Sequence, residues 1–169
     1  STTTSAPRPV APDLVERLFD NVTGPGQLWF ADITYVATWE GFLYVAIVLD
    51  AFSRRMIGWS MRDNLEAELV VDALGMAATR RNPAAGAIFH SDRGSQYAST
   101  VFGRTLRESG LAQSMGRRGC ALDNAACESA FATLKTELVH RRSFRTRDQE
   151  REEIFRWMEG WHNTRRRQS

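Results

Sequence analysis

Cysteine, histidine and long apolar runs are scarce in this chain of 169 residues. The two cysteines, Cys120 and Cys127, are too few for a disulfide framework, and with three histidines they lack the spacing of a zinc site. The longest uninterrupted apolar run, residues 42–49, spans 8 residues, whereas about 18 or more are needed to cross a bilayer. We therefore exclude disulfide-rich secreted proteins and membrane-spanning proteins, and expect a cytoplasmic protein.

Lysine is also scarce, since 21 of the 22 basic residues are arginine and Lys135 is the exception. The net charge of +2 is unevenly distributed. Residues 1–92 carry 7 basic and 11 acidic residues, whereas residues 93–169 carry 15 basic and 9 acidic residues. A basic half on one domain suits a polyanionic partner such as nucleic acid. A solvated arginine-rich surface explains the same distribution equally well.

The length predicts one globular domain with a short extension. Residues 1–27 are rich in Ser, Thr, Pro and Gly, which indicates an N-terminal arm or linker, and residues 28–169 form the predicted core. The expected strands are residues 28–38, 41–50, 54–61, 86–91 and 111–115. The expected helices are residues 66–80, 99–109, 123–140 and 146–162. Short connectors make the first three strands an antiparallel meander, and the fold class is α/β (α+β), with a five-stranded mixed sheet flanked by helices.

Three acidic residues lie at the edges of apolar elements. Asp32 interrupts the apolar run of residues 28–33, Asp92 follows an apolar strand, and Glu128 lies one turn into an expected helix. Carboxylates that converge from separate elements repel one another unless a cation is present, and hard oxygen ligands suit Mg²⁺ or Mn²⁺. Two such ions can promote in-line phosphoryl transfer. Each acid taken alone is more typical of a surface or capping carboxylate than of a catalytic one, as we expect of Asp50 in a turn and Asp123 at a helix start.

The segments around these acids resemble three motifs of the integrase-like transposases of bacterial insertion sequences, known as the DDE group. The segments are residues 29–35 (WFADITY), 90–97 (HSDRGSQY) and 123–129 (DNAACES). Between Asp92 and Glu128 lie 35 residues, a spacing that this group shares with retroviral integrases. The resemblance extends from about residue 25 to the end of the chain.

This resemblance implies an RNase H-like fold in which Asp32, Asp92 and Glu128 are catalytic and bind two Mg²⁺ (or Mn²⁺) ions. It implies DNA cleavage by water at transposon ends, followed by transesterification that joins the 3′-hydroxyl to target DNA. The expected partners are transposon-end and target DNA, and a homo-oligomer is expected because two ends must be joined. The expected location is the bacterial cytoplasm, in association with the nucleoid.

Further residues are candidates around this site. Lys135 lies seven residues after Glu128 and so returns to nearly the same helix face; the resemblance associates a lysine here with DNA positioning, and an ion pair with Glu128 or Glu137 is the alternative. Other candidate DNA contacts are Arg117, Arg118, Arg141 and Arg142, which a solvated surface would also explain. His90 and Asn124 are expected to support the metal ligands, and His90 as a ligand is the less favoured alternative.

Two other functions fit parts of the pattern. One is a DNA-binding architectural module without catalysis, which the intact set of three acids disfavours. The other is an RNase H-type nuclease that cuts RNA in hybrids, which the 35-residue spacing and the third motif disfavour.

Overall fold

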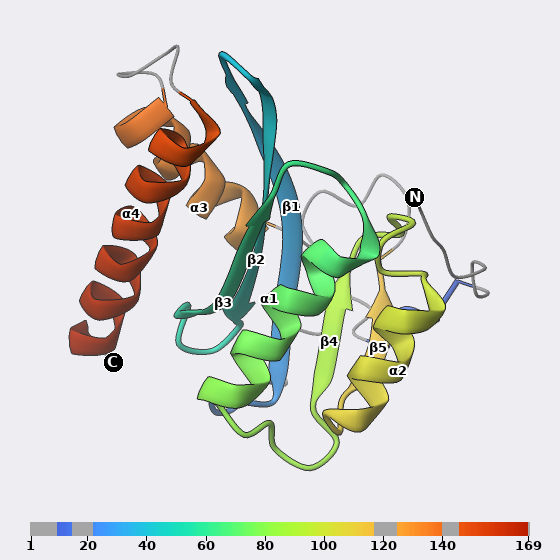
Figure 1. Ribbon diagram of the computed structural model, residues 1–169. Coiled ribbons are helices and arrows are strands. Elements are labelled where there is room, and N and C mark those ends of the chain that lie inside the picture. The colour runs from blue at the N-terminus through green and yellow to red at the C-terminus, as the bar shows by residue number, and fades with distance from the viewer. Residues whose placement is uncertain (1–9, 15–21, 117–124, 140–145, 169) are drawn as a thin grey trace.

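A five-stranded mixed sheet forms the centre of the molecule (Figure 1). The computed structural model describes residues 10–14, 22–116, 125–139 and 146–168. The strands are β1 (Leu28–Thr38), β2 (Gly41–Asp50), β3 (Met56–Arg62), β4 (Ile88–Ser91) and β5 (Ala112–Met115), in the order β3-β2-β1-β4-β5. Strands β1, β2 and β3 pair antiparallel, which confirms the meander, whereas β4 pairs parallel to β1 and β5 parallel to β4.

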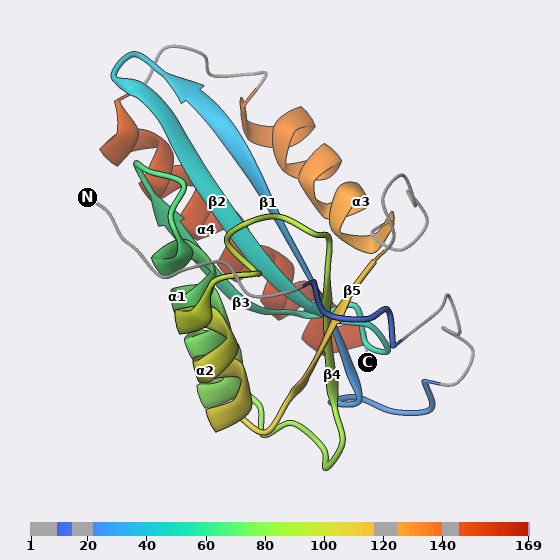
Figure 2. The same ribbon diagram turned by 90° about the vertical axis from the view of Figure 1, so that its right-hand side faces the viewer.

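Helices cover both faces of this sheet (Figures 1 and 2). On one face lie α1 (Ala67–Arg80) and α2 (Thr100–Glu108). On the other lie α3 (Ala125–Leu134), which continues as a π-helical turn (Lys135–Val139), and α4 (Arg147–Gln168). Among the described residues no helix is both long and apolar enough to span a bilayer.

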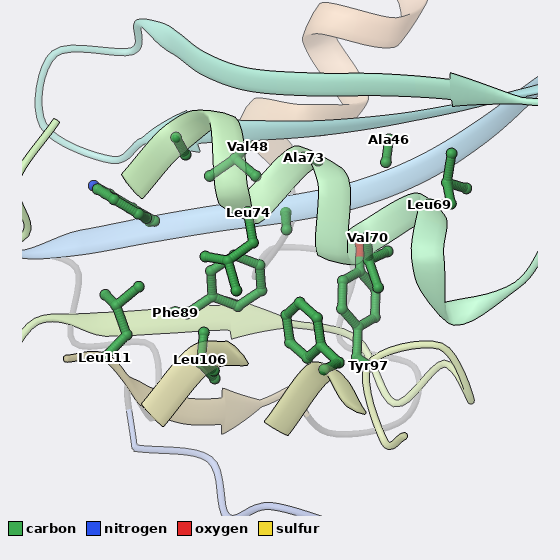
Figure 3. Close-up of a cluster of buried hydrophobic side chains, with 14 of the residues drawn as sticks. Ala46, Val48, Leu69, Val70, Ala73, Leu74, Phe89, Tyr97, Leu106 and Leu111 are labelled. Atoms are coloured by element: carbon green, nitrogen blue, oxygen red, sulfur yellow. The ribbon is translucent and has the colours of Figure 1, made fainter. Parts of the chain in front are cut away.

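Side-chain alternation along β1 supplies one core on each face of the sheet. Trp29 and Ala31 belong to the cluster beneath α1 and α2, and Leu28 and Phe30 to the cluster beneath α3 and α4. Figure 3 shows part of the first cluster, where Leu74 of α1 and Leu106 of α2 lie against Phe89 of β4. Because both faces are buried, the central strands are almost continuously apolar, as expected of strands covered on two sides.

The turn between β2 and β3 depends on Asp50, as the sequence predicts. Its buried carboxylate accepts hydrogen bonds from the backbone N–H of Gly26 (2.8 Å), the backbone N–H of Ser53 (2.8 Å) and the Ser53 hydroxyl (3.0 Å). Arg54 lies in this turn with a φ of 63°, so β3 begins at Met56 and the predicted start at residue 54 is wrong. Arg54 and Arg55, which we expected in the strand, belong instead to the turn before it.

The described part of the N-terminal segment lies beside β5. The backbone N–H of Met115 donates to the Pro12 carbonyl (3.1 Å), and the backbone N–H of Leu14 donates to the Ser114 hydroxyl (2.9 Å). These bonds satisfy backbone groups at the edge strand of the sheet, which would otherwise be open to pairing with another chain. The division into an arm (residues 1–27) and a core (residues 28–169) stays a prediction.

Candidate active site

The parallel pairing of β1 with β4 brings the first two acids together. Its register pairs Leu28 with Ile88 and Phe30 with His90. Extending this register by two positions places Asp32 opposite Asp92, although 60 residues separate them in the chain. Asp92 therefore lies directly after the carboxyl end of β4, beside Asp32 in the middle of β1. The carboxyl end of a parallel strand is the usual place for ligands in open α/β sheets.

Both carboxylates line one pocket of about 180 Å³. The Oδ1 atom of Asp32 accepts a hydrogen bond from the backbone N–H of Ile33 (2.9 Å), and Oδ1 of Asp92 accepts one from the backbone N–H of Gly94 (2.8 Å). Each bond holds a carboxylate in place through a neighbour in the chain. Asp32 is half-buried and Asp92 is exposed, so the pocket is open to a solvent-borne substrate.

Glu128 approaches the same region from α3. It is exposed and follows Cys127, whose thiol is fully buried. Burial raises the pKa of the Cys127 thiol well above its usual range, and the nearby carboxylates of Asp32 and Glu128 raise it further, whereas Arg54 opposes the shift. Asp32 and Glu128 therefore act on one buried group between β1 and α3.

Tyr97 links the two aspartates in the same way. Its phenol is fully buried, and burial raises its pKa well above the usual range, with further contributions from Asp32, Asp92 and Cys127. Tyr97 therefore lies within the electrostatic influence of Asp32 and Asp92, and Cys127 within that of Asp32 and Glu128, and both buried groups stay neutral at physiological pH.

The donor set at this edge suits a hard divalent cation. Asp32, Asp92 and Glu128 supply only carboxylate oxygens, which Mg²⁺ and Mn²⁺ prefer. In the chain as described, however, no three His, Cys, Asp or Glu side chains lie close enough together to hold a metal ion. The residues present fit the ion by their chemistry, and the side chains would have to converge on it.

His90 is buried near the end of β4, two residues before Asp92. Its Nδ1 atom lies 2.7 Å from the Ser114 hydroxyl oxygen, and its ring is edge-on to Phe30 at a centroid distance of 6.0 Å. These contacts connect the end of β4 to β5 and β1. The expected supporting role of His90 stays a prediction.

Lys135 lies at the start of the π-helical turn, on the side of α3 that approaches β1. Its Nζ atom is 5.7 Å from the centroid of the Tyr35 ring, and Tyr35 lines the pocket that contains Asp32 and Asp92. The carboxylate of Glu137, one of the alternative partners of Lys135, accepts a hydrogen bond from Nε1 of Trp157 instead (2.8 Å).

The other candidate residues lie outside the described residues. They are Arg117, Arg118, Asn124, Arg141 and Arg142, together with the expected helix cap at Asp123.

Several pocket residues were not expected from the sequence. Tyr35, Tyr44, Gln96 and Tyr97 line the pocket with the two aspartates. Gln96 and Tyr97 belong to the motif at residues 90–97, so their place in that motif was an available signal. Tyr44 offered no local signal, because it reaches the pocket only by pairing with Tyr35 across β1 and β2.

The five-stranded mixed sheet with helices on both faces has the architecture of an RNase H-like fold. Solved retroviral structures share this fold. The chain superposes on the simian T-cell lymphotropic virus intasome in complex with the PP2A regulatory subunit B56 gamma with a TM-score of 0.61, covering 80% of this chain and 44% of that one at 16% identity. It superposes on the HTLV-2 integrase catalytic core domain in complex with magnesium with a TM-score of 0.55, covering 66% and 69% at 15% identity.

The chain belongs to the integrase core domain family, whose models match residues 22–121 and 109–169. It is 42% identical to the transposase for insertion sequence element IS904 of Lactococcus lactis, covering 94% of this chain and 62% of that protein. It is 44% identical to the transposase InsF for insertion sequence IS3A of Escherichia coli, covering 95% and 56%. The chain therefore spans about three fifths of the length of these curated relatives.

Proposed function

We propose that residues 28–169 are the catalytic core of an insertion-sequence transposase, with residues 1–27 as its arm. The observation that carries this proposal is that Asp32 of β1 and Asp92, which directly follows the neighbouring parallel strand β4, line one pocket. Glu128 would supply the third acid from α3, a helix that contacts β1. The relatives named as transposases support the same activity.

The proposed reaction has two phosphoryl-transfer steps. Water first attacks the phosphodiester at a transposon end, which breaks the bond to the 3′-oxygen and leaves a 3′-hydroxyl. That hydroxyl then attacks a phosphodiester of target DNA, forms a new bond to phosphorus and releases the target 3′-oxygen. Neither step requires a nucleophilic side chain from the protein.

Asp32, Asp92 and Glu128 would hold two Mg²⁺ or Mn²⁺ ions. When bound, such ions supply Lewis-acid activation of the attacking oxygen and charge stabilisation of the leaving oxygen. The protein's own contribution is positional. The Ile33 and Gly94 N–H groups orient the two aspartates.

The proposed partners are transposon-end DNA, target DNA and further copies of the chain, because two ends must be joined. The proposed cellular location is the bacterial cytoplasm, at the nucleoid. Lys135 is proposed to contact the DNA backbone, as are Arg117, Arg118, Arg141 and Arg142. His90 and Asn124 are proposed to support the metal ligands.

A strand-transfer assay with Asp92→Asn tests the function. The variant keeps the Oδ1 atom that accepts the Gly94 hydrogen bond, so folding and DNA affinity should be retained. Loss of a charged metal ligand should lower Mg²⁺-dependent cleavage and joining by about 10³-fold, which corresponds to about 4 kcal/mol. The matched control is Asp72→Asn, an exposed α1 carboxylate that pairs with Arg62, and it should keep full activity.

The same assay separates the alternative functions. An architectural module would bind end DNA with no cleavage by the wild type, and an RNase H-type nuclease would cut the RNA of a hybrid without joining DNA. Substantial Mg²⁺-dependent joining by Asp92→Asn would remove Asp92 from the catalytic site.

A further inference from the structure

The hairpin of β1 and β2 extends past the end of β4, beyond the rest of the sheet (Figures 1 and 2). Beyond Phe30 the described part of β1 pairs only with β2. One face of this extension carries Tyr35, Phe42 and Tyr44, which we call the hairpin aromatic surface. Tyr35 and Tyr44 are direct cross-strand partners, and Phe42 lies two residues from Tyr44, so the three side chains share a face.

The rings of this surface contact one another; Tyr35 and Phe42 are exposed, and Tyr44 is half-buried against the core. The Tyr35 and Phe42 centroids are 4.6 Å apart, those of Phe42 and Tyr44 are 6.2 Å apart, and those of Tyr35 and Tyr44 are 6.3 Å apart. Tyr35 is 54% exposed and Phe42 is 46% exposed. Single exposed aromatic residues scattered over a protein surface are common. A contiguous group of exposed aromatic residues on paired strands is instead typical of a binding surface.

The surface is continuous with the candidate active site and is accompanied by a cation. Tyr35 and Tyr44 line the pocket that contains Asp32 and Asp92. The Lys135 ammonium lies 5.7 Å from the centre of the Tyr35 ring. Aromatic rings that stack bases beside a cation that binds phosphate are the combination that single-stranded nucleic acid requires.

We propose that the hairpin aromatic surface binds unpaired bases of the DNA strand whose phosphate lies at Asp32 and Asp92. This inference rests on the proposed function and adds a site to it. Tyr35 is three residues from Asp32, which is about 10 Å along a strand. At about 3.4 Å per stacked base, the bound bases are those within about three nucleotides of the reacting phosphate. Lys135 contacts the backbone of the same nucleotides.

A binding experiment without metal tests the surface independently of catalysis. The probe is a single-stranded end sequence with 2-aminopurine within three nucleotides of the cleavage position, in EDTA. The wild type should quench the probe by stacking. The Tyr35→Ala/Phe42→Ala variant should lose the quenching and bind at least about fivefold more weakly, the lower limit for one stacked base, with blunt duplex binding changed by less than about twofold.

The chain offers a matched control in Phe52→Ala. Phe52 is 52% exposed, close to the 46% of Phe42, but it follows the other end of β2, about 30 Å away along the strand. Phe52→Ala should bind and quench like the wild type, and so should Tyr35→Phe, which keeps the ring. Thermal melts check that every variant is folded. Unchanged quenching and affinity in the folded double variant would overturn the inference.

A joining assay in Mg²⁺ distinguishes this failure from failure of the proposed function. If the wild type joins DNA and the double variant joins frayed and blunt ends equally well, the inference is wrong and the function stands. If the wild type joins nothing, the function is wrong, and the quenching experiment still decides whether the surface binds bases.

Discussion

Substitution of Gly58 by alanine should destabilise the protein severely, because helix α1 lies directly on this residue of β3. A Cβ atom at Gly58 would overlap the carbonyl oxygen of Ala73 and would lie 2.9 Å from both the backbone nitrogen and the Cβ of Ala77. These are backbone atoms and a methyl group of a regular helix, so no flexible side chain can move aside. The helix must move away from the sheet.

The magnitude follows from what α1 buries. The side chains of Leu69, Val70 and Leu74 in α1 are at most 2% exposed. Moving α1 away from the sheet therefore loosens contacts along the whole helix. Overpacking of a well-packed core costs about 1–3 kcal/mol, occasionally more, and the rigid contacts place Gly58→Ala at about 3 kcal/mol. For a domain of this size that corresponds to a fall in Tm of about 6–12 °C.

Gly75→Ala is the matched control, since it makes the same chemical change within α1. A Cβ at Gly75 meets no atom within 4 Å, and alanine favours a helix over glycine by about 1 kcal/mol. Gly75→Ala should therefore raise the free energy of unfolding by up to about 1 kcal/mol. Urea denaturation with unchanged m-values checks both variants. Equal stability of Gly58→Ala and the wild type would refute the described packing of α1 on β3.

Three other predictions concern the turn, the buried thiol and the lysine. Asp50→Ala should lower the free energy of unfolding in urea by about 3 kcal/mol, because three donors lose a buried charged acceptor; a loss below about 1 kcal/mol would contradict this role. The pKa of the Cys127 thiol is raised in the folded protein. The contribution of the neutral thiol to the free energy of unfolding is therefore complete below about pH 8.5, the pKa of a cysteine in the unfolded chain. This contribution is lost as the pH rises above that value, because the thiol of the unfolded chain then ionises. Urea titrations between pH 8 and 10 should show a shallower decline for Cys127→Ala than for the wild type, and parallel curves would refute the assignment. Lys135→Ala should lower the binding and joining of end DNA by about tenfold, with a stability change of about 1 kcal/mol or less. The control Arg151→Ala removes an exposed cation paired with Asp148 and should leave binding and joining unchanged. Equal joining rates in the two variants would exclude the proposed role of Lys135.

Local pattern predicted most of the elements and singled out the three acids as candidates, whose catalytic role stays a prediction. The strand over residues 41–50 is predicted by its β-branched and aromatic content and has the same bounds in the structure. Asp32 is conspicuous because it interrupts an apolar strand, which is a property of its immediate neighbours. The helix at residues 99–109 is similarly local, since the Ser99 hydroxyl accepts the backbone N–H of Phe102 as an N-cap. The continuation of α3 as a π-helical turn was not predicted, because an apolar helical period does not distinguish the two forms.

The tertiary structure decided which elements become neighbours. The side chains of β1 would alternate between the two faces of the sheet beside any neighbouring strand. The sequence of β1 therefore does not specify that it pairs parallel to β4 with Phe30 opposite His90. That register places Asp32 and Asp92 in one pocket, and the early end of β4 leaves Tyr35 exposed on the hairpin. Alternation is a local consequence of backbone geometry, whereas strand order and register depend on packing between residues far apart in the chain. For this protein the sequence by itself indicated Asp32, Asp92 and Glu128 as candidate acids, and the packing of the sheet brought Asp32 and Asp92 into one pocket.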